Sequence, residues 1–214
     1  MEKNVEFNIT APFCTLNELT KETTDLWIVC HGFGQMAKHF IRRFDVLDKQ
    51  SNYVIALQGL SRFYFDQYQK VGASWMTREN KDIDLKNQKS YFDAVLSNVL
   101  NGESLNDFNV HLLGFSQGVA MVSRMAAYRK IDFKNLIVWA GSFPAELKKD
   151  QFKHLSDESK LTVVLGDKDE YIPIGENFDI AVKHAETVLG RTAEIVTFQG
   201  GHEMSREVLS SLKI

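Results

Sequence analysis

The sequence contains few of the residues that crosslink small secreted proteins or separate domains. Its 214 residues include three prolines and two cysteines, Cys14 and Cys30. Each cysteine lies in or beside an expected strand, and nothing in the sequence indicates an oxidising compartment, so we expect both thiols to be free, reduced and buried. No stretch rich in Pro, Ser or Gly divides the chain. The length and the missing linker predict one domain over residues 1–214.

Long apolar runs and an excess of basic charge are also absent. No apolar stretch approaches the length of a membrane span, and residues 1–7 lack the basic-then-apolar pattern of a secretion signal. The net charge of −3 gives no footprint of a nucleic-acid-binding protein. The histidines and cysteines lack metal-ligand spacing, and no glycine-rich phosphate loop is present. We therefore expect a cytoplasmic protein with no cofactor, no metal, no membrane span and no nucleic-acid partner.

Apolar runs rich in β-branched residues alternate with helical patterns along the chain. The expected strands are 26–30, 53–57, 110–113, 136–140, 161–165 and 193–198. The expected helices are 36–47, 85–100, 117–129, 174–189 and 203–212. Strands that are almost continuously apolar are typical of parallel strands buried on both faces, and their alternation with helices predicts a doubly wound α/β sheet. Residues 4–16, with Val5, Phe7 and Ile9 on one face, are expected to add an antiparallel edge strand.

The most informative motif is Gly-Phe-Ser-Gln-Gly at residues 114–118. An apolar run precedes it and a helical pattern follows, which is the context of a nucleophile elbow with Ser116 as the nucleophile. Small residues are required on both sides of such a serine, and Gly114 and Gly118 fill those positions. The alternative is a glycine-flanked turn in which the serine only caps a helix.

In a doubly wound sheet, ligands bind beyond the carboxyl ends of the strands, so residues that follow strands are the candidates for chemistry. Residues 31–35, His-Gly-Phe-Gly-Gln, follow the first of these strands. The backbone amide of Phe33, together with that of Gln117, would form an oxyanion hole. His31 is expected to be a structural hydrogen-bonding residue rather than a base.

Two further strand ends carry an acid and a histidine. Asp167 and Asp169 follow the strand at 161–165, and Asp169 is the preferred acid with Asp167 as its rival. His202 follows the last strand on a glycine-containing turn. The resulting order, Ser116, then Asp169, then His202, is that of α/β-hydrolases and differs from those of chymotrypsin and subtilisin.

The chain resembles the phospholipase/carboxylesterase family of small α/β-hydrolases, which includes bacterial carboxylesterases and acyl-protein thioesterases. The resemblance rests on residues 31–34, 114–118, 166–169 and 201–202 and spans essentially the whole chain. It implies an α/β-hydrolase fold and hydrolysis of esters or thioesters with no metal or organic cofactor. Because the chain has no large insertion between its late strands, we expect no separate lid domain. It also favours Asp169 as the catalytic acid, and it makes a homodimer plausible because the family includes dimers.

One segment departs from that family. Acyl-protein thioesterases usually carry Trp-Phe/Tyr-Asp where this chain has Ser-Trp-Met-Thr-Arg at residues 74–78. This departure speaks against a lipidated-protein substrate and leaves the hydrolase chemistry unaffected.

The connection between residues 59 and 80 is long for a compact domain and rich in aromatic residues. We expect it to wall the acyl pocket, with four residues as the substrate contacts: Leu60, Phe63, Trp75 and Met76. The alternative is that these side chains simply cover the sheet.

These observations predict a serine hydrolase that cleaves small carboxylic esters or thioesters of short to medium acyl chains through an acyl-enzyme intermediate. Two other functions stay open. The first is a protein of the same fold that binds a small ligand without turnover, since fold does not fix function. The second is a peptidase or amidase that uses the same residues.

Overall fold

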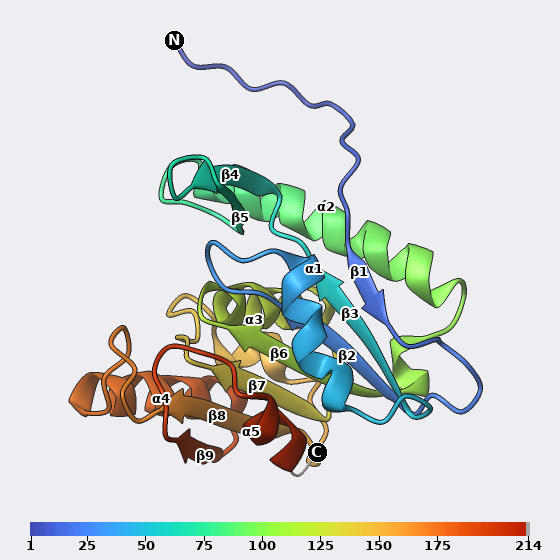
Figure 1. Cartoon of the computed structure of the whole chain (residues 1–214). Helices are drawn as coiled ribbons and strands as arrows, with labels where there is room; N and C mark the ends of the chain where they lie inside the picture. Colours follow the sequence, from blue (N-terminus) through green and yellow to red (C-terminus); the bar gives the residue numbers. More distant parts are fainter. Residues whose placement is uncertain (213–214) are drawn as a thin grey trace.

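The computed structural model describes residues 1–212, and its main feature is a seven-stranded sheet (Figure 1). Its strands, in sheet order, are β1 (Cys14–Leu16), β3 (Asn52–Leu57), β2 (Asp25–Cys30), β6 (Asn109–Phe115), β7 (Asn135–Trp139), β8 (Lys160–Gly166) and β9 (Ala193–Phe198). Each of the six apolar runs identified in the sequence is one of these strands.

The sheet is parallel except at one edge. Strand β2 pairs in parallel with β3 on one side and with β6 on the other, so that Ile28 lies opposite both Ile55 and Leu112. All three side chains are fully buried, because helices cover both faces of the sheet. Strand β1 is antiparallel to β3 and forms the edge. The predicted α/β-hydrolase fold with a mostly parallel sheet is confirmed.

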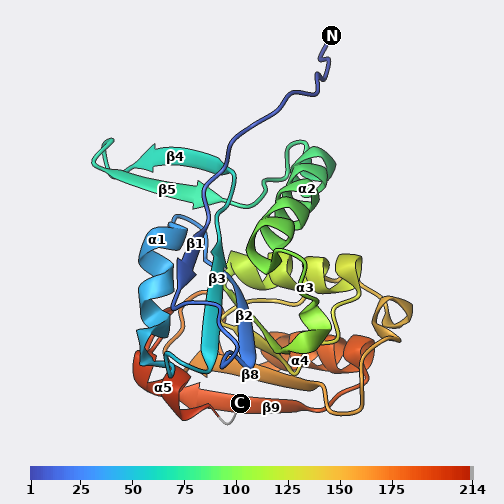
Figure 2. The ribbon, with the colours of Figure 1, turned by 90° about the vertical axis from the view of Figure 1, so that its right-hand side faces the viewer.

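Helices lie on both faces of the sheet, as Figure 2 shows. The α-helices are α1 (Ala37–Phe40), α2 (Lys81–Leu100), α3 (Gln117–Arg129), α4 (Glu176–Leu189) and α5 (Arg206–Ser211). Short 3₁₀ helices occupy Ile41–Val46, Leu105–Asp107 and Lys149–Phe152. Helices α1 and α5 cover one face, and α2, α3 and α4 cover the other. The helix expected over 36–47 is thus split into α1 and a 3₁₀ helix, whereas α3 has the predicted bounds.

The edge strand expected over residues 4–16 is much shorter than predicted. Only Cys14–Leu16 pairs with β3, and Cys14 lies opposite Ala56. Because the pairing is antiparallel, the residues before Phe13 run past the carboxyl end of β3, which is Leu57, and have no strand beside them. The apolar residues of that segment are therefore exposed rather than paired.

The connection between residues 59 and 80 contains a β-hairpin that the sequence analysis missed. Strands β4 (Ser61–Phe65) and β5 (Lys70–Ser74) pair with each other and form a separate two-stranded sheet. Figure 2 shows this hairpin beyond the carboxyl ends of the main strands, the edge at which α/β proteins bind ligands.

Both cysteines are free, as expected. Burial raises the pKa of the Cys30 thiol far above its usual range, and it raises that of the partly buried Cys14 as well. No α-helix in the described part of the chain is both long enough and apolar enough to cross a bilayer.

Candidate active site

Ser116 occupies the sharp turn between β6 and α3. Its backbone has φ 53° and ψ −119°, a conformation that L-residues seldom adopt. The turn is also tightly packed. A Cβ atom on Gly114 would lie 2.3 Å from Cα of Val119, and one on Gly118 would lie 2.1 Å from the carbonyl oxygen of Cys30. These contacts explain why glycine is needed on both sides of the serine.

The structure also tests whether Ser116 serves only as a helix cap. Ser116 is the N-cap residue of α3, yet its side chain makes no capping hydrogen bond. Its backbone N–H donates to the carbonyl oxygen of Trp139 at 2.9 Å, which ties the turn to the end of β7. The capping alternative is therefore excluded, and the hydroxyl of this partly buried residue is not used to satisfy the helix.

Asp169 and His202 contact each other directly. Oδ2 of Asp169 accepts a hydrogen bond of 2.8 Å from Nδ1 of His202. Its other oxygen, Oδ1, accepts two backbone hydrogen bonds, from the N–H groups of Tyr171 and Ile172, each 2.9 Å long. An ionised carboxylate only accepts hydrogen bonds, so Nδ1 carries the proton and Nε2 of the neutral ring has the free lone pair. This arrangement suits an imidazole that accepts a proton at Nε2.

Asp167, the rival acid, has a different environment. It is exposed, and its Oδ1 accepts a hydrogen bond of 3.1 Å from the N–H of Gly200. The side chain therefore braces the loop after β9 and does not bond to the His202 ring. That ring instead contacts Phe115 and Tyr171, with centroid distances of 5.0 and 4.8 Å.

The two candidate oxyanion donors lie on neighbouring segments of the sheet edge. Phe33 follows β2, and Gln117 is the first residue of α3. Within residues 1–212, neither backbone N–H donates a hydrogen bond to a protein acceptor. Free N–H groups beside a nucleophile are what a developing oxyanion requires.

The end of β5 connects these two donors. The Gln117 side chain accepts a hydrogen bond from the N–H of Trp75 at 3.1 Å and donates one to the carbonyl oxygen of Met76 at 2.9 Å. On the other side, the N–H of Gly34 donates to the carbonyl oxygen of Ala73 at 2.9 Å. The hairpin therefore holds both the residue after the nucleophile and the loop that contains Phe33.

His31 is buried beneath that loop. Its Nδ1 lies 2.8 Å from the carbonyl oxygen of Gly32, and its Nε2 accepts a hydrogen bond of 3.0 Å from the N–H of Gly59. Burial lowers the pKa of His31 to about 4, so the ring is neutral near pH 7. The prediction that His31 is a structural hydrogen-bonding residue is confirmed.

The four residues expected to contact substrate have different environments. Trp75 is only 1% exposed, and its indole N–H donates to the carbonyl oxygen of His31 at 2.7 Å. It is a core residue, so the expectation that it lines an acyl pocket is wrong. Leu60 lines a cavity between α2 and the N-terminal segment. Phe63 stacks on Phe33 at a centroid distance of 5.1 Å, and Met76 is half-buried next to Gln117.

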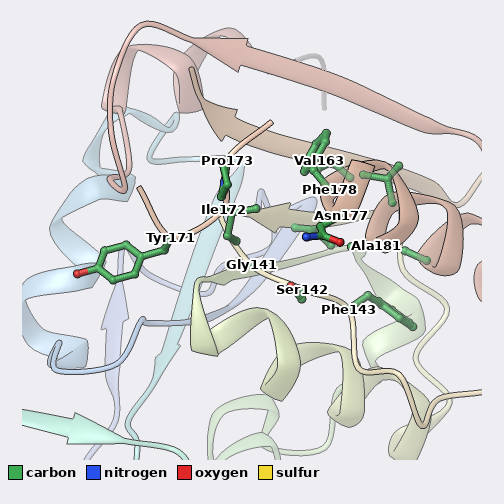
Figure 3. Close-up of a pocket in the computed structure, with 13 residues that line it drawn as sticks. Gly141, Ser142, Phe143, Val163, Tyr171, Ile172, Pro173, Asn177, Phe178 and Ala181 are labelled. Carbon is green, nitrogen blue, oxygen red and sulfur yellow. The ribbon is translucent and has the colours of Figure 1, made fainter. Parts of the chain in front are cut away.

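A cavity that the sequence did not predict lies on the side of Ser116 away from the hairpin, as shown in Figure 3. Its volume is about 210 Å³, and its walls come mainly from the loop after β7, the loop after β8 and helix α4. Two lining residues, Gly141 and Tyr171, lie just beyond strand ends, which is the same signal that identified the other candidate residues.

Comparisons with known proteins agree with this fold. The Dyadobacter fermentans phospholipase/carboxylesterase superposes with a TM-score of 0.66 at 17% identity, over 97% of this chain and 98% of that one. Zea mays acyl-protein thioesterase 2 superposes with a TM-score of 0.65 at 15% sequence identity, over 94% of this chain and 95% of the maize chain. The Bacillus cereus carboxylesterase superposes with a TM-score of 0.63 at 12% sequence identity, over 92% of this chain and 89% of the carboxylesterase chain. No curated protein has a significantly similar sequence.

At these identities the structural likeness establishes the fold alone. A family model described as "Serine hydrolase (FSH1)" matches residues 23–207, which include the elbow, both aspartates and His202. The chain therefore belongs to the serine hydrolase (FSH1) family.

Proposed function

We propose that the protein hydrolyses carboxylic esters or thioesters with Ser116 as the nucleophile, His202 as the general base and Asp169 as the residue that orients it. The observation that carries this proposal is the 2.8 Å hydrogen bond from His202 to the buried Asp169 carboxylate, on loops that follow β8 and β9. The strained Ser116 backbone supports it, because such a conformation is kept where it presents a side chain for chemistry.

The reaction would proceed in two steps, acylation of Ser116 and then deacylation. Oγ of Ser116 bonds to the acyl carbon while its proton passes to Nε2 of His202, and the leaving oxygen or sulfur then takes that proton as its bond to carbon breaks. Water next attacks the acyl-enzyme. His202 accepts a proton from the water and returns it to Oγ of Ser116 as the bond between Oγ and the acyl carbon breaks, which releases the carboxylic acid and regenerates the enzyme.

The oxyanion would bind to the N–H groups of Phe33 and Gln117. Both are free of protein acceptors in the described residues, and each follows a strand end next to Ser116. Loss of one such donor typically lowers kcat by about 10²–10³-fold.

Esters and thioesters are favoured over amides as the substrate class. The maize acyl-protein thioesterase and the Bacillus cereus carboxylesterase share this fold over nearly their whole length. We propose acyl groups of short to medium length, with Phe63 and Met76 near the oxyanion loop as contacts for the outer part of the substrate. A homodimer is also proposed, and a monomer mass in light scattering would contradict it.

Labelling with a fluorophosphonate probe tests the nucleophile. The wild type and Ser123→Ala are expected to react, and Ser116→Ala is not. Ser123 is a matched control because it lies on the same helix with a buried hydroxyl. Equal labelling of Ser116→Ala would contradict the assignment, and an unreactive wild type would favour a binding protein without turnover.

Turnover is tested with p-nitrophenyl esters from acetate to decanoate beside matched thioester and amide substrates. Asp169→Asn is expected to lower kcat by about 10⁴-fold, because the histidine would lose the partner that fixes its tautomer. Faster cleavage of the amides than of the esters would favour the peptidase alternative.

A further inference from the structure

We propose that the cavity between the loop after β7, the loop after β8 and α4 binds the acyl chain of the substrate, and that it selects an uncharged chain of up to about eight carbons. This inference rests on the proposed function. The sequence predicts an acyl pocket at the hairpin. The cavity proposed here lies on the opposite side of Ser116.

The cavity begins beside the three candidate catalytic residues. Gly141 lines it, and a Cβ on Gly141 would lie 2.5 Å from the carbonyl oxygen of Ser116. Tyr171 lines it as well, packing edge-on against the His202 ring, and its N–H bonds to Asp169. The walls nearest the site are therefore held by the same loops that hold the nucleophile, base and acid.

The sheet order separates this cavity from the oxyanion donors. Phe33 follows β2, which lies on one side of β6, whereas the cavity lies beyond β7 and β8 on the other side. When the Phe33 and Gln117 amides hold the carbonyl oxygen, a different substituent of the acyl carbon must therefore point towards the cavity.

That substituent is assigned as the acyl chain rather than the leaving group. The cavity is closed at the back by the buried side chains of Phe143, Phe178 and Val182. Tyr171, against His202, is 72% exposed, so the histidine side of the site faces solvent. A leaving group can depart past that open side, whereas a chain that stays attached to Ser116 until deacylation suits a cavity whose back is formed by buried side chains.

The chemistry of the walls defines the ligand class. The thirteen lining residues, all within the described part of the chain, include no charged side chain, and the floor is aliphatic and aromatic (Figure 3). A carboxylate or ammonium group placed there would lose much of its hydration without an oppositely charged side chain to pair with. The cavity should therefore exclude amino-acyl and dicarboxylic acyl groups.

The volume limits the chain length. An apolar protein cavity of about 150 Å³ accommodates benzene, so scaling to 210 Å³ gives room for about eight carbons. Each methylene that enters the cavity should raise kcat/KM by about fourfold until the cavity is full, if the whole gain of burial is realised in the transition state.

The test measures kcat/KM for p-nitrophenyl esters from C2 to C12 on the wild type and two cavity variants. Ala181→Leu adds three carbons at a lining position, and Val182→Ala removes two from the floor. Ala181→Leu is expected to lower kcat/KM for the octanoate by about tenfold to a hundredfold and leave the acetate within about twofold. Val182→Ala should move the optimum to a longer chain.

The matched control is Ala94→Leu, the same substitution at an exposed position of α2 outside this cavity. Unchanged profiles for both cavity variants would overturn the proposal, provided that urea unfolding shows them folded. A second series with a constant acetyl group and alcohols of increasing length separates the two arms of the substrate. If Ala181→Leu changed that alcohol series and not the acyl series, the acyl assignment would be wrong.

Failure of this inference is distinguishable from failure of the proposed function. Fluorophosphonate labelling of Ser116 that is equal in the wild type and Ala181→Leu, with no change in the acyl-length profile, would overturn the cavity assignment alone. A wild type that neither reacts with the probe nor hydrolyses any ester would overturn both.

Discussion

The N–H of Trp75 donates a hydrogen bond of 3.1 Å to Oε1 of Gln117, although the two residues are 42 positions apart. Gln117 directly follows the proposed nucleophile, and Trp75 directly follows β5 of the hairpin. The indole of Trp75 also bonds to the carbonyl oxygen of His31 at 2.7 Å. One tryptophan thus ties together the beginning of α3 and the loop after β2, which carry the two proposed oxyanion donors.

This connection predicts a catalytic effect of the Gln117 side chain. Gln117→Ala keeps the backbone N–H and removes the hydrogen bonds that orient it. We expect kcat to fall by about tenfold, less than for loss of a donor, with KM changed by less than about threefold. Steady-state kinetics on a p-nitrophenyl ester measures both. Gln69→Ala, at an exposed position in the turn of the same hairpin, is the control, and a kcat equal to that of the control would contradict the prediction.

Trp75→Phe tests the same connection through stability. It leaves the buried carbonyl oxygen of His31 without its 2.7 Å hydrogen bond while keeping an aromatic ring in the core. The free energy of unfolding is expected to fall by about 1–3 kcal/mol, the usual effect of leaving a buried polar group unpaired. Urea unfolding measures it. The control is Phe65→Leu on the exposed part of the hairpin, which should change the free energy of unfolding by less than about 0.5 kcal/mol. An equally small change for Trp75→Phe would show that the indole N–H has no structural role.

Gly118→Ala should disrupt the elbow. The added Cβ would lie 2.1 Å from the carbonyl oxygen of Cys30, a backbone atom in the middle of the sheet that has no room to move. We expect fluorophosphonate labelling of Ser116 to be lost or the protein to fail to fold. The matched control is Gly201→Ala, where the nearest atom would be 3.5 Å away, and circular dichroism should show that variant folded. Normal labelling of Gly118→Ala would mean that the turn can relax, contrary to its packing.

Much of the fold could be predicted because burial and sterics act locally. Strands β2, β3, β6, β7 and β8 are buried on both faces, so their sequences are almost continuously apolar. The elbow could be predicted because a Cβ added to Gly114 or Gly118 would lie only about 2 Å from backbone atoms, so only glycine fits at these positions.

Other features depend on contacts that leave no local pattern. The hairpin was missed because its turn uses Asp66, Gln67 and Tyr68 with positive φ, without the glycine or Asn-Gly that usually signals such a turn. The alternation of Val5, Phe7 and Ile9 predicted a strand, but a strand needs a neighbour, and β3 ends too early to provide one. The pattern around Trp75 predicts a pocket residue, because nothing in the sequence shows that its indole N–H bonds to the carbonyl oxygen of His31.

The buried His31 predicts a pH dependence of stability. Its pKa is lowered by burial to about 4 in the folded protein, against about 6.5 for an unperturbed histidine. Between these values the unfolded chain binds one more proton at this position, so the free energy of unfolding should fall as the pH falls from about 6.5 towards 4, by up to about 1.4 kcal/mol per pH unit. Above about pH 6.5 the ring is neutral in both states and contributes no slope. Burial also lowers the pKa of His111, which adds a contribution of the same sign.

Urea unfolding at pH 7.5 and pH 5 isolates the contribution of His31. The wild type should lose about 2 kcal/mol more on this change of pH than His31→Asn, because the variant has no imidazole to protonate on unfolding. His39→Asn, which removes an exposed imidazole from α1, is the control substitution. If His31→Asn and the wild type lost stability equally, the buried ring would have to be protonated already in the folded state. Its Nε2 could then no longer accept the hydrogen bond from the N–H of Gly59, and the loop before the proposed oxyanion donor would have to be held in another way.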